Sequence, residues 1–320
     1  MLKQRAQILS LGICLTALLG WTFRGNAQIT VEVGFDKEQY LPFEPIILQV
    51  KITNFSGRTL HLGEDPDWLD ILVERTDGRV VRQIAQPPVV YPFQVPNAAR
   101  AIRRLNITPY FAVKDPAEYK VTVTVRIKEL GLELESKPGK FIVVPGTPFW
   151  EQTFGYQRKD KHGQPIGLPE IRRYALLQVP SGRRILLYVR VSNADGSFVY
   201  RIFPVGVFLT FSHPETQIDR QSNLHLLWQS GARDFTYIVV DPNGRLLRRK
   251  TYRYTYSRPH LWPGPHGKIR VIGGTPITTP YDIPPPKTNT VSSTTHTNTP
   301  PSKPSTNQPP PKPKTSSEKH

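Results

Sequence analysis

A run of basic and aromatic side chains near residue 250 has the chemistry of a binding surface for an anionic ligand. If residues 246–256 form a β-strand, alternate side chains share a face, which places three tyrosines beside two cations and two arginines on the other face. Cations attract anionic sugars, and aromatic rings stack on sugar or base rings. The alternative is a strand whose tyrosines pack inward and whose arginines are only solvated. The candidate ligand-binding residues are Arg248, Arg249, Lys250, Tyr252, Arg253 and Tyr254.

Motifs for catalysis or metal binding are absent from the sequence. The histidines are scattered, and there is no His-Glu-x-x-His, Gly-x-Ser-x-Gly, phosphate loop or dinucleotide fingerprint. His225 lies in an alternating segment, which predicts a structural histidine, whereas a catalytic role would require Asp219 and Asp234 beside it. The acidic segment 63–70 has oxygen ligands that Ca²⁺ prefers, but Pro66 favours a solvated turn. We therefore predict no catalytic residue, no metal and no cofactor.

The segments that precede this region have the pattern of β-strands separated by proline and glycine. Residues 29–33 and 119–127 alternate apolar and polar side chains, as half-buried strands do. Residues 69–73 and 80–81 flank an Asp-Gly turn, which is typical of a hairpin. The pattern predicts an all-β fold, with a sandwich over residues 28–148.

The start of this sandwich resembles exported bacterial immunoglobulin-like domains, which include the bead domains of alpha-2-macroglobulins and a bacterial proteinase-inhibitor domain. Residues 40–44 read Tyr-Leu-Pro-Phe-Glu where such domains commonly read Tyr-x-Pro-Gly-Glu, and residues 54–56 supply an Asn-x-Ser that ends a strand. Phe43 replaces the usual glycine, and residues 115–119 lack the glycine of a Pro-Gly-x-Tyr motif. The resemblance implies an immunoglobulin-like sandwich, and no inhibitory residue can be matched.

Residues 149–275 are predicted to form a second, basic β-meander domain. A strand, an Asn/Asp-Gly turn and another strand occur twice, with Tyr188 and Tyr237 at equivalent positions. Residues 219–228 resemble a blade of sialidase-like propellers, in which Asp-x-x-Gly-Asn precedes His-x-x-Trp. A propeller needs at least about four blades and there is room for about two, so we expect an incomplete propeller-like sheet with no catalytic residue carried over.

Residues 1–27 have the parts of a secretory signal peptide, with a basic head, an uncharged apolar run and small residues before Ala27. Cleavage after Ala27 would remove Cys14, the one cysteine of the chain, and would leave a mature chain without a transmembrane span. We therefore expect an exported protein that is periplasmic, at the cell surface or secreted. An uncleaved signal anchor is the alternative.

Positive charge is concentrated in the second half of the chain. Residues 149–283 carry 19 Lys and Arg against 9 Asp and Glu, whereas residues 28–148 carry 15 of each. Residues 276–320 are rich in Pro, Thr, Ser and Lys, which predicts a disordered tail. Outside the cytoplasm such a charge asymmetry favours an anionic envelope polymer or lipid headgroup as the neighbour, and we expect no nucleic acid.

These features indicate an exported, non-catalytic binding or scaffolding protein of the cell envelope. Its partner would be an anionic envelope polymer or another envelope protein, contacted through the basic second domain. Two alternatives stay open. A glycan-active enzyme would need His225 and nearby acids to meet in a cleft, and a protease inhibitor would need a rigid exposed loop on the sandwich.

Overall fold

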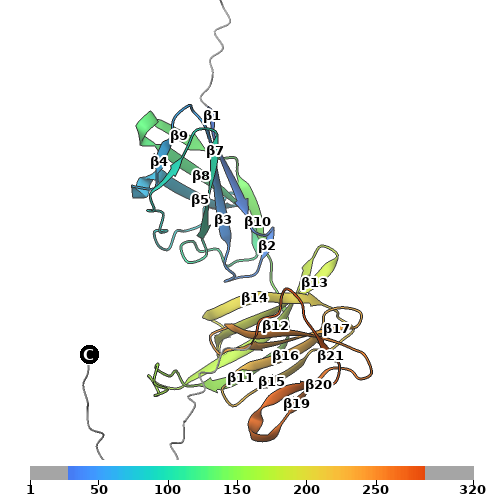
Figure 1. The fold of residues 1–320 in the computed structure, drawn as a ribbon. Helices are drawn as coiled ribbons and strands as arrows, with labels where there is room; N and C mark the ends of the chain where they lie inside the picture. The colour runs from blue at the N-terminus through green and yellow to red at the C-terminus, as the bar shows by residue number, and fades with distance from the viewer. Residues whose placement is uncertain (1–27, 285–320) are drawn as a thin grey trace, which may run out of the picture. The chain divides into compact units, whose positions relative to one another are not determined.

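Residues 28–284 are described by the computed structural model and consist of β-strands joined by turns and loops (Figure 1). The fold is all-β, as the alternating patterns predict. The helical elements of this described part are three short 3₁₀ turns, Pro66–Trp68, Lys128–Leu130 and Pro265–Gly267. Within the same residues, no helix has the length and apolar character needed to cross a membrane. The predicted signal peptide lies outside the described residues, as does the tail beyond residue 284.

Two main sheets form the first half of the molecule. The first has the strand order β1 (Gln28–Phe35), β3 (Ile47–Phe55), β7 (Ala99–Asn106). The second has the order β2 (Gln39–Tyr40), β10 (Gly139–Val143), β8 (Ala117–Ile127), β5 (Leu69–Arg75), and β9 (Leu132–Glu135) also pairs with β8. A small separate pair is formed by β4 (Leu60–Leu62) and β6 (Phe93–Val95).

One apolar core joins the two sheets of the first half. Alternate residues of β3 are buried, and Val121, Val123 and Val125 of β8 are fully buried in the same cluster. Each such side chain stabilises the fold by about 1.5–3 kcal/mol relative to leaving it exposed. Two facing layers with inward-pointing alternate residues agree with the predicted sandwich, and its identity as an immunoglobulin-like domain stays a prediction.

The second half contains two further antiparallel sheets. One is the meander β11 (Thr147–Tyr156), β12 (Glu170–Ser181), β13 (Arg184–Asn193), β14 (Val199–Phe208). The other runs through β15 (Glu215–Ile218), β16 (Leu224–Gln229), β17 (Asp234–Val240), β18 (Leu246–Arg253) and β21 (Thr275–Ile277). A hairpin of β19 (His260–Pro263) and β20 (Ile269–Ile272) adds Leu261 and Ile269 to a cluster with Phe235 and Tyr237 of β17.

The main core of the second half lies between its two sheets. Tyr174 and Leu176 of β12 share a buried cluster with Leu226 and Trp228 of β16 and with Ile238 of β17. These residues alternate along their strands, because every second side chain of a strand points to the same face. Packing these faces together therefore fixes where the turns at the strand ends meet.

Three turns of the second half are built in the same way. Asp160, Asp219 and Asp241 each accept backbone N–H bonds, at 2.7–2.9 Å, from the residues two and four positions later. Gly163 and Gly244 have positive φ angles of 82° and 78° at the fourth position of their turns. An aspartate that bonds its own backbone favours such a turn, and glycine tolerates its left-handed residue.

The left-handed residue of the third turn is Ser222, with φ of 63°. In the propeller-blade motif this position is the glycine of Asp-x-x-Gly-Asn. Phe43 shows the same effect in the first half, because its φ is 68° where the immunoglobulin-like motif has glycine. A left-handed conformation costs a non-glycine residue about 1–2 kcal/mol. At both positions the chain therefore keeps the turn of the motif without the residue that adopts it most easily.

Two predicted boundaries need correction. The ordered part continues past residue 276, because β21 pairs with β18 and the backbone of Ile283 bonds to that of Arg249. A short, proline-containing edge strand gives little sequence signal. The basic strand itself ends at Arg253 instead of Tyr256.

Candidate functional site: a basic groove in the second half

Arg249, in the middle of the predicted basic strand, points between the two sheets of the second half. Its Nη1 donates to the backbone C=O of Val205 on β14 at 2.9 Å, and its guanidinium carbon lies 6.0 Å from the centre of the Trp228 ring. Burial lowers the pKa of Arg249. The side chain therefore connects β18 to β14 and is not presented to a ligand.

Two more cations of β18 are held by carboxylates. Lys250 Nζ lies 3.1 Å from Asp282 Oδ2. Arg253 forms a two-pronged contact with Asp234, with Nε–Oδ1 at 2.8 Å and Nη2–Oδ2 at 3.3 Å. These partners offset much of the positive charge that the sequence places on this strand.

The tyrosines of the predicted ligand-binding strand do not form one stacking face. Tyr252 is half-buried and meets the ring of Tyr237 edge-on at 6.5 Å, and Arg248 lies 5.7 Å from the centre of the same ring. Tyr254 is exposed, but it follows the end of β18. The structure thus divides the six predicted residues among a core, two ion pairs and a loop.

A different cationic surface forms where the turns of the second half meet. It is a groove of about 610 Å³, here called the basic groove, between the start of the β11–β12 connection and the Asp219 turn. Its lining contains two cations, an aromatic ring, amides and a hydroxyl, but no carboxylate and no histidine. The lining residues are Gly155, Tyr156, Gln157, Lys159, Pro169, Arg220, Gln221 and Ser222.

Tyr156 is held in place by a buried arginine behind it. Arg172 is 1% exposed, and its guanidinium carbon lies 4.1 Å from the centre of the Tyr156 ring and 3.8 Å from that of Tyr200. Its Nε and Nη2 donate to Glu170 Oε2 at 2.9 and 2.8 Å, and its Nη1 donates to the Pro242 C=O at 2.8 Å. Arg172 thus ties β12 to the β17–β18 turn and orients the ring of the groove.

The Asp219 turn positions Arg220 and Ser222 at the other side of the groove. Ser222 Oγ donates to the Gly155 C=O at 2.9 Å, and Tyr174 Oη donates to the Ser222 C=O at 2.9 Å. The Arg220 side chain lies against Gly267, where an added Cβ would come within 2.9 Å of Arg220 Nε. The turn is therefore hydrogen-bonded to β11 and β12, and its Arg220 side chain packs against the β19–β20 hairpin.

The acids nearest the basic groove are already bonded to protein groups. Glu170 is paired with Arg172 and Arg158, and the hydrogen bond from Arg172 lowers the pKa of Glu170. Burial raises the pKa of Asp219, but hydrogen bonds from His225 and Asn223 outweigh it and leave that pKa below its ordinary value. Within residues 28–284, no carboxylate forms an ion pair with the two groove cations, both of which are exposed. The groove can therefore hold an anionic group.

His225 and Asp219 lie next to each other, as the enzyme alternative requires, but the imidazole is buried and bonded to other protein side chains. His225 Nε2 lies 3.1 Å from Asp219 Oδ2 and Nδ1 lies 2.7 Å from Tyr237 Oη. The imidazole is buried, and burial raises the pKa of Tyr237 to about 12. Asp234 is bonded to Arg253 instead. This network fixes the turn that carries Arg220, and both ring nitrogens are occupied.

The acidic segment 63–70 does not gather its carboxylates. Asp65 pairs with Lys128 at 2.7 Å, and Asp70 accepts the backbone N–H of Ile71 at 2.9 Å. In the part of the chain that the structure describes, no group of three or more His, Cys, Asp or Glu side chains is placed to hold a metal ion.

Comparisons with known proteins do not identify a family or a function for this chain. No protein-family model matches the chain, and no curated protein matches it. Among solved structures, the chain is similar to Spo0M, a sporulation control protein from Bacillus subtilis, at 10% sequence identity, with 55% of this chain and 90% of that chain covered. The TM-score of that comparison is 0.23, which is too low to carry an argument about fold or function.

Proposed function

We propose that the chain is an exported, non-catalytic binding protein that holds an anionic polymer of the cell envelope in its basic groove. The observation that carries this proposal is the lining of the groove, which contains Lys159, Arg220 and Tyr156 but no carboxylate. The pattern of residues 1–27 supports export.

The surroundings of the groove favour a polyanion over a single small ion. Residues 149–283 carry a net charge of +10, so the field around the groove attracts negative charge from beyond its lining. The groove is open and lies on turns, so a long chain is able to pass across it. Tyr156 offers a face for a sugar ring, since aromatic rings pack well against such surfaces.

Binding of labelled polymers by the intact protein tests the proposal. We expect fluorescein-labelled polyphosphate and polygalacturonate to bind, neutral dextran of similar length not to bind, and the affinity to fall as NaCl rises from 50 to 300 mM. The salt effect follows because exposed charges are screened over about 10 Å at 0.1 M ionic strength. Equally tight binding of dextran, or an affinity that does not change with salt concentration, would show that the charge of the groove does not cause polymer binding.

Two matched double variants locate the site. Lys159→Ser with Arg220→Ser should weaken polymer binding about tenfold, because each lost contact contributes up to about 0.7–1 kcal/mol. Arg183→Ser with Arg184→Ser removes the same charge from the exposed β12–β13 turn, at the other end of the strands, and should change affinity less than about twofold. Equal losses in both variants would mean that net charge alone binds the polymer.

A further inference from the structure

The outer edge of β5 in the first half has no strand beside it over its first residues. β5 is last in the order of its sheet and pairs only with β8 over Leu69–Arg75 among the described strands. Val73 C=O accepts an outward bond from the Val81 N–H at 2.8 Å. Because backbone groups alternate in direction along a strand, those of Leu69 and Ile71 also point away from β8.

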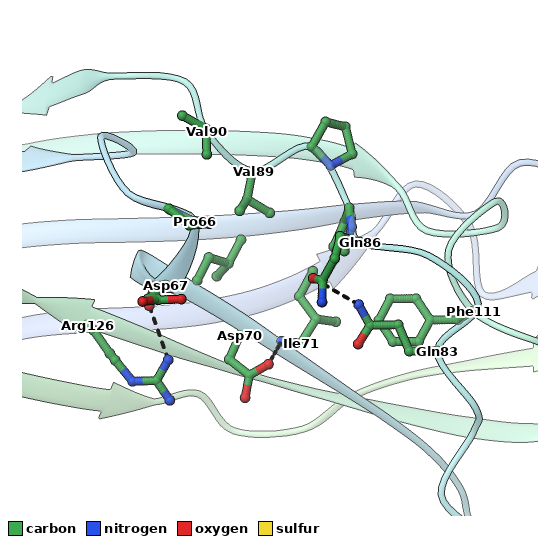
Figure 2. A pocket seen from close by; sticks show the side chains of 13 residues that line it. Pro66, Asp67, Asp70, Ile71, Gln83, Gln86, Val89, Val90, Phe111 and Arg126 are labelled. Atoms are coloured by element: carbon green, nitrogen blue, oxygen red, sulfur yellow. Dashed lines mark hydrogen bonds between the residues drawn. The ribbon is translucent and has the colours of Figure 1, made fainter.

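A groove of about 680 Å³, here called the edge groove, runs along this part of β5 (Figure 2). Its opposite wall is the segment 86–90, which includes two prolines. The indole N–H of Trp68 donates to the Val89 C=O at 2.9 Å and holds this wall. Ile71 and Phe111 are buried apolar residues that line the groove between the two sides.

Two aspartates, Asp67 and Asp70, line the edge groove on the β5 side (Figure 2). Asp70 Oδ1 accepts the N–H of Ile71 at 2.9 Å. The carboxylate thus occupies an outward N–H of the edge, which protects a free strand edge from unselective pairing. Neither aspartate forms an ion pair within residues 28–284. The one cation of the lining, Arg126, is paired with Glu133 at 3.3 Å and donates from Nη1 to the backbone C=O of Asp67 at 3.1 Å.

From this geometry we infer that the edge groove binds an extended peptide that adds a strand to β5 and alternates apolar and basic side chains. The apolar side chains lie against Ile71 and Phe111. The basic side chains stand on the outer face beside Asp70, at cross-strand distance. A cation there attracts the Asp70 carboxylate and frees the Ile71 N–H for a carbonyl of the peptide. This site is separate from the basic groove and takes a ligand of opposite charge.

A second copy of this chain is a poor occupant of the same edge. A twofold pairing of β5 with β5 would bring the two aspartates of one copy toward those of the other. Like charges directly opposite each other destabilise a strand pair. The charge of the rim therefore selects a basic polypeptide partner.

Three labelled heptapeptides test the inference by fluorescence anisotropy with the intact protein. The first alternates valine and lysine, the second alternates valine and glutamate, and the third is the valine–lysine peptide with methyl groups on alternate backbone nitrogens. We expect the first to bind, and the other two to bind at least about fivefold more weakly, because charge and backbone pairing are both needed. Equal binding of all three would overturn the inference.

Charge reversal at the rim provides the second arm. Asp70→Lys should reverse the preference, so that the valine–glutamate peptide binds better than the valine–lysine peptide. Glu135→Lys, an exposed carboxylate on β9 outside the edge groove, is the matched control and should keep the original preference. The same shift in both variants would refute a site at β5. The methylated peptide is tested on the unaltered protein, so a folding defect in Asp70→Lys leaves that arm decisive.

Discussion

The basic strand β18 and the basic groove carry the same kinds of residues and treat them in opposite ways. On β18, Arg249 bonds a backbone carbonyl between the sheets, and Lys250 and Arg253 are paired with acids. In the basic groove, Lys159 and Arg220 are exposed beside a tyrosine with no carboxylate in the lining. The cations that are adjacent in the sequence on β18 are therefore bonded to protein groups. Lys159 and Arg220, which are far apart in the sequence, instead lie exposed in one groove.

The position of the acids explains this difference. Asp234 lies directly across from Arg253 on the neighbouring strand, which makes a cross-strand ion pair favourable. Near the groove, Asp160, Asp219 and Asp241 instead accept backbone N–H groups of their own turns. None of these three aspartates forms an ion pair with Lys159 or Arg220 within residues 28–284. Whether the cations of a segment can bind a ligand thus depends less on their number than on whether nearby carboxylates pair with them.

The largest effect is expected at Arg172, the buried cation that supports the groove. Arg172→Ala should lower the free energy of unfolding by about 3 kcal/mol, because it removes two hydrogen bonds to Glu170, leaves the Pro242 carbonyl without its partner and opens space between two rings. Denaturant unfolding measures this. Arg172→Lys keeps the charge but loses the planar fork, and should recover less than half of the loss. Wild-type stability of the alanine variant would show that the cation does not organise the groove.

Arg249 should show a smaller loss that separates a structural role from a binding role. Arg249→Ala should cost about 1–2 kcal/mol of stability through the lost bond to Val205, and leave polymer binding unchanged. Arg249→Met loses the same bond but keeps a long side chain beside Trp228 and removes a buried Nε that has no partner, so it should stay within about 1 kcal/mol of the wild type. If Arg249→Ala reduced polymer binding without changing stability, Arg249 would be a ligand-binding residue, as the sequence predicts.

A pH-dependent effect is expected at Glu170, and its sign follows from the lowered pKa. The hydrogen bond from Arg172 brings that pKa below 4.5 in the folded state, so the pair stabilises the fold above about pH 4.5 and this contribution is lost as pH falls through the folded pKa. Between pH 5 and pH 3 the unfolding free energy of Glu170→Gln should therefore fall less steeply than that of the wild type. Parallel curves would mean that Glu170 contributes nothing to the acid response.

Much of the fold could be predicted because strand patterns are local. The alternation of residues 119–127 became β8, and the repeated strand-turn-strand pattern became β13–β14 and β17–β18. β7 was missed because arginines occupy several of its positions, and an edge strand tolerates them. The position of Phe43 in a left-handed conformation shows that a motif can keep its turn after losing its glycine.

The basic groove could not be predicted because its residues come from separate segments of the chain. Tyr156, Lys159 and Arg220 are brought together only when the two sheets of the second half pack face to face. A local signal existed in the spacing Asp-x-x-Gly/Ser, which recurs at Asp160, Asp219 and Asp241. It marks three similar turns, but it does not say that they meet.

The most direct test compares the two cationic regions in one experiment. Polyphosphate binding is measured for the wild type, for Lys159→Ser with Arg220→Ser, and for Lys250→Ser with Arg253→Ser, which removes the same charge from β18. We expect about tenfold weaker binding in the groove variant and less than about twofold change in the β18 variant, because the β18 cations are already paired. The opposite ranking, with the β18 variant losing affinity and the groove variant retaining it, would contradict the account.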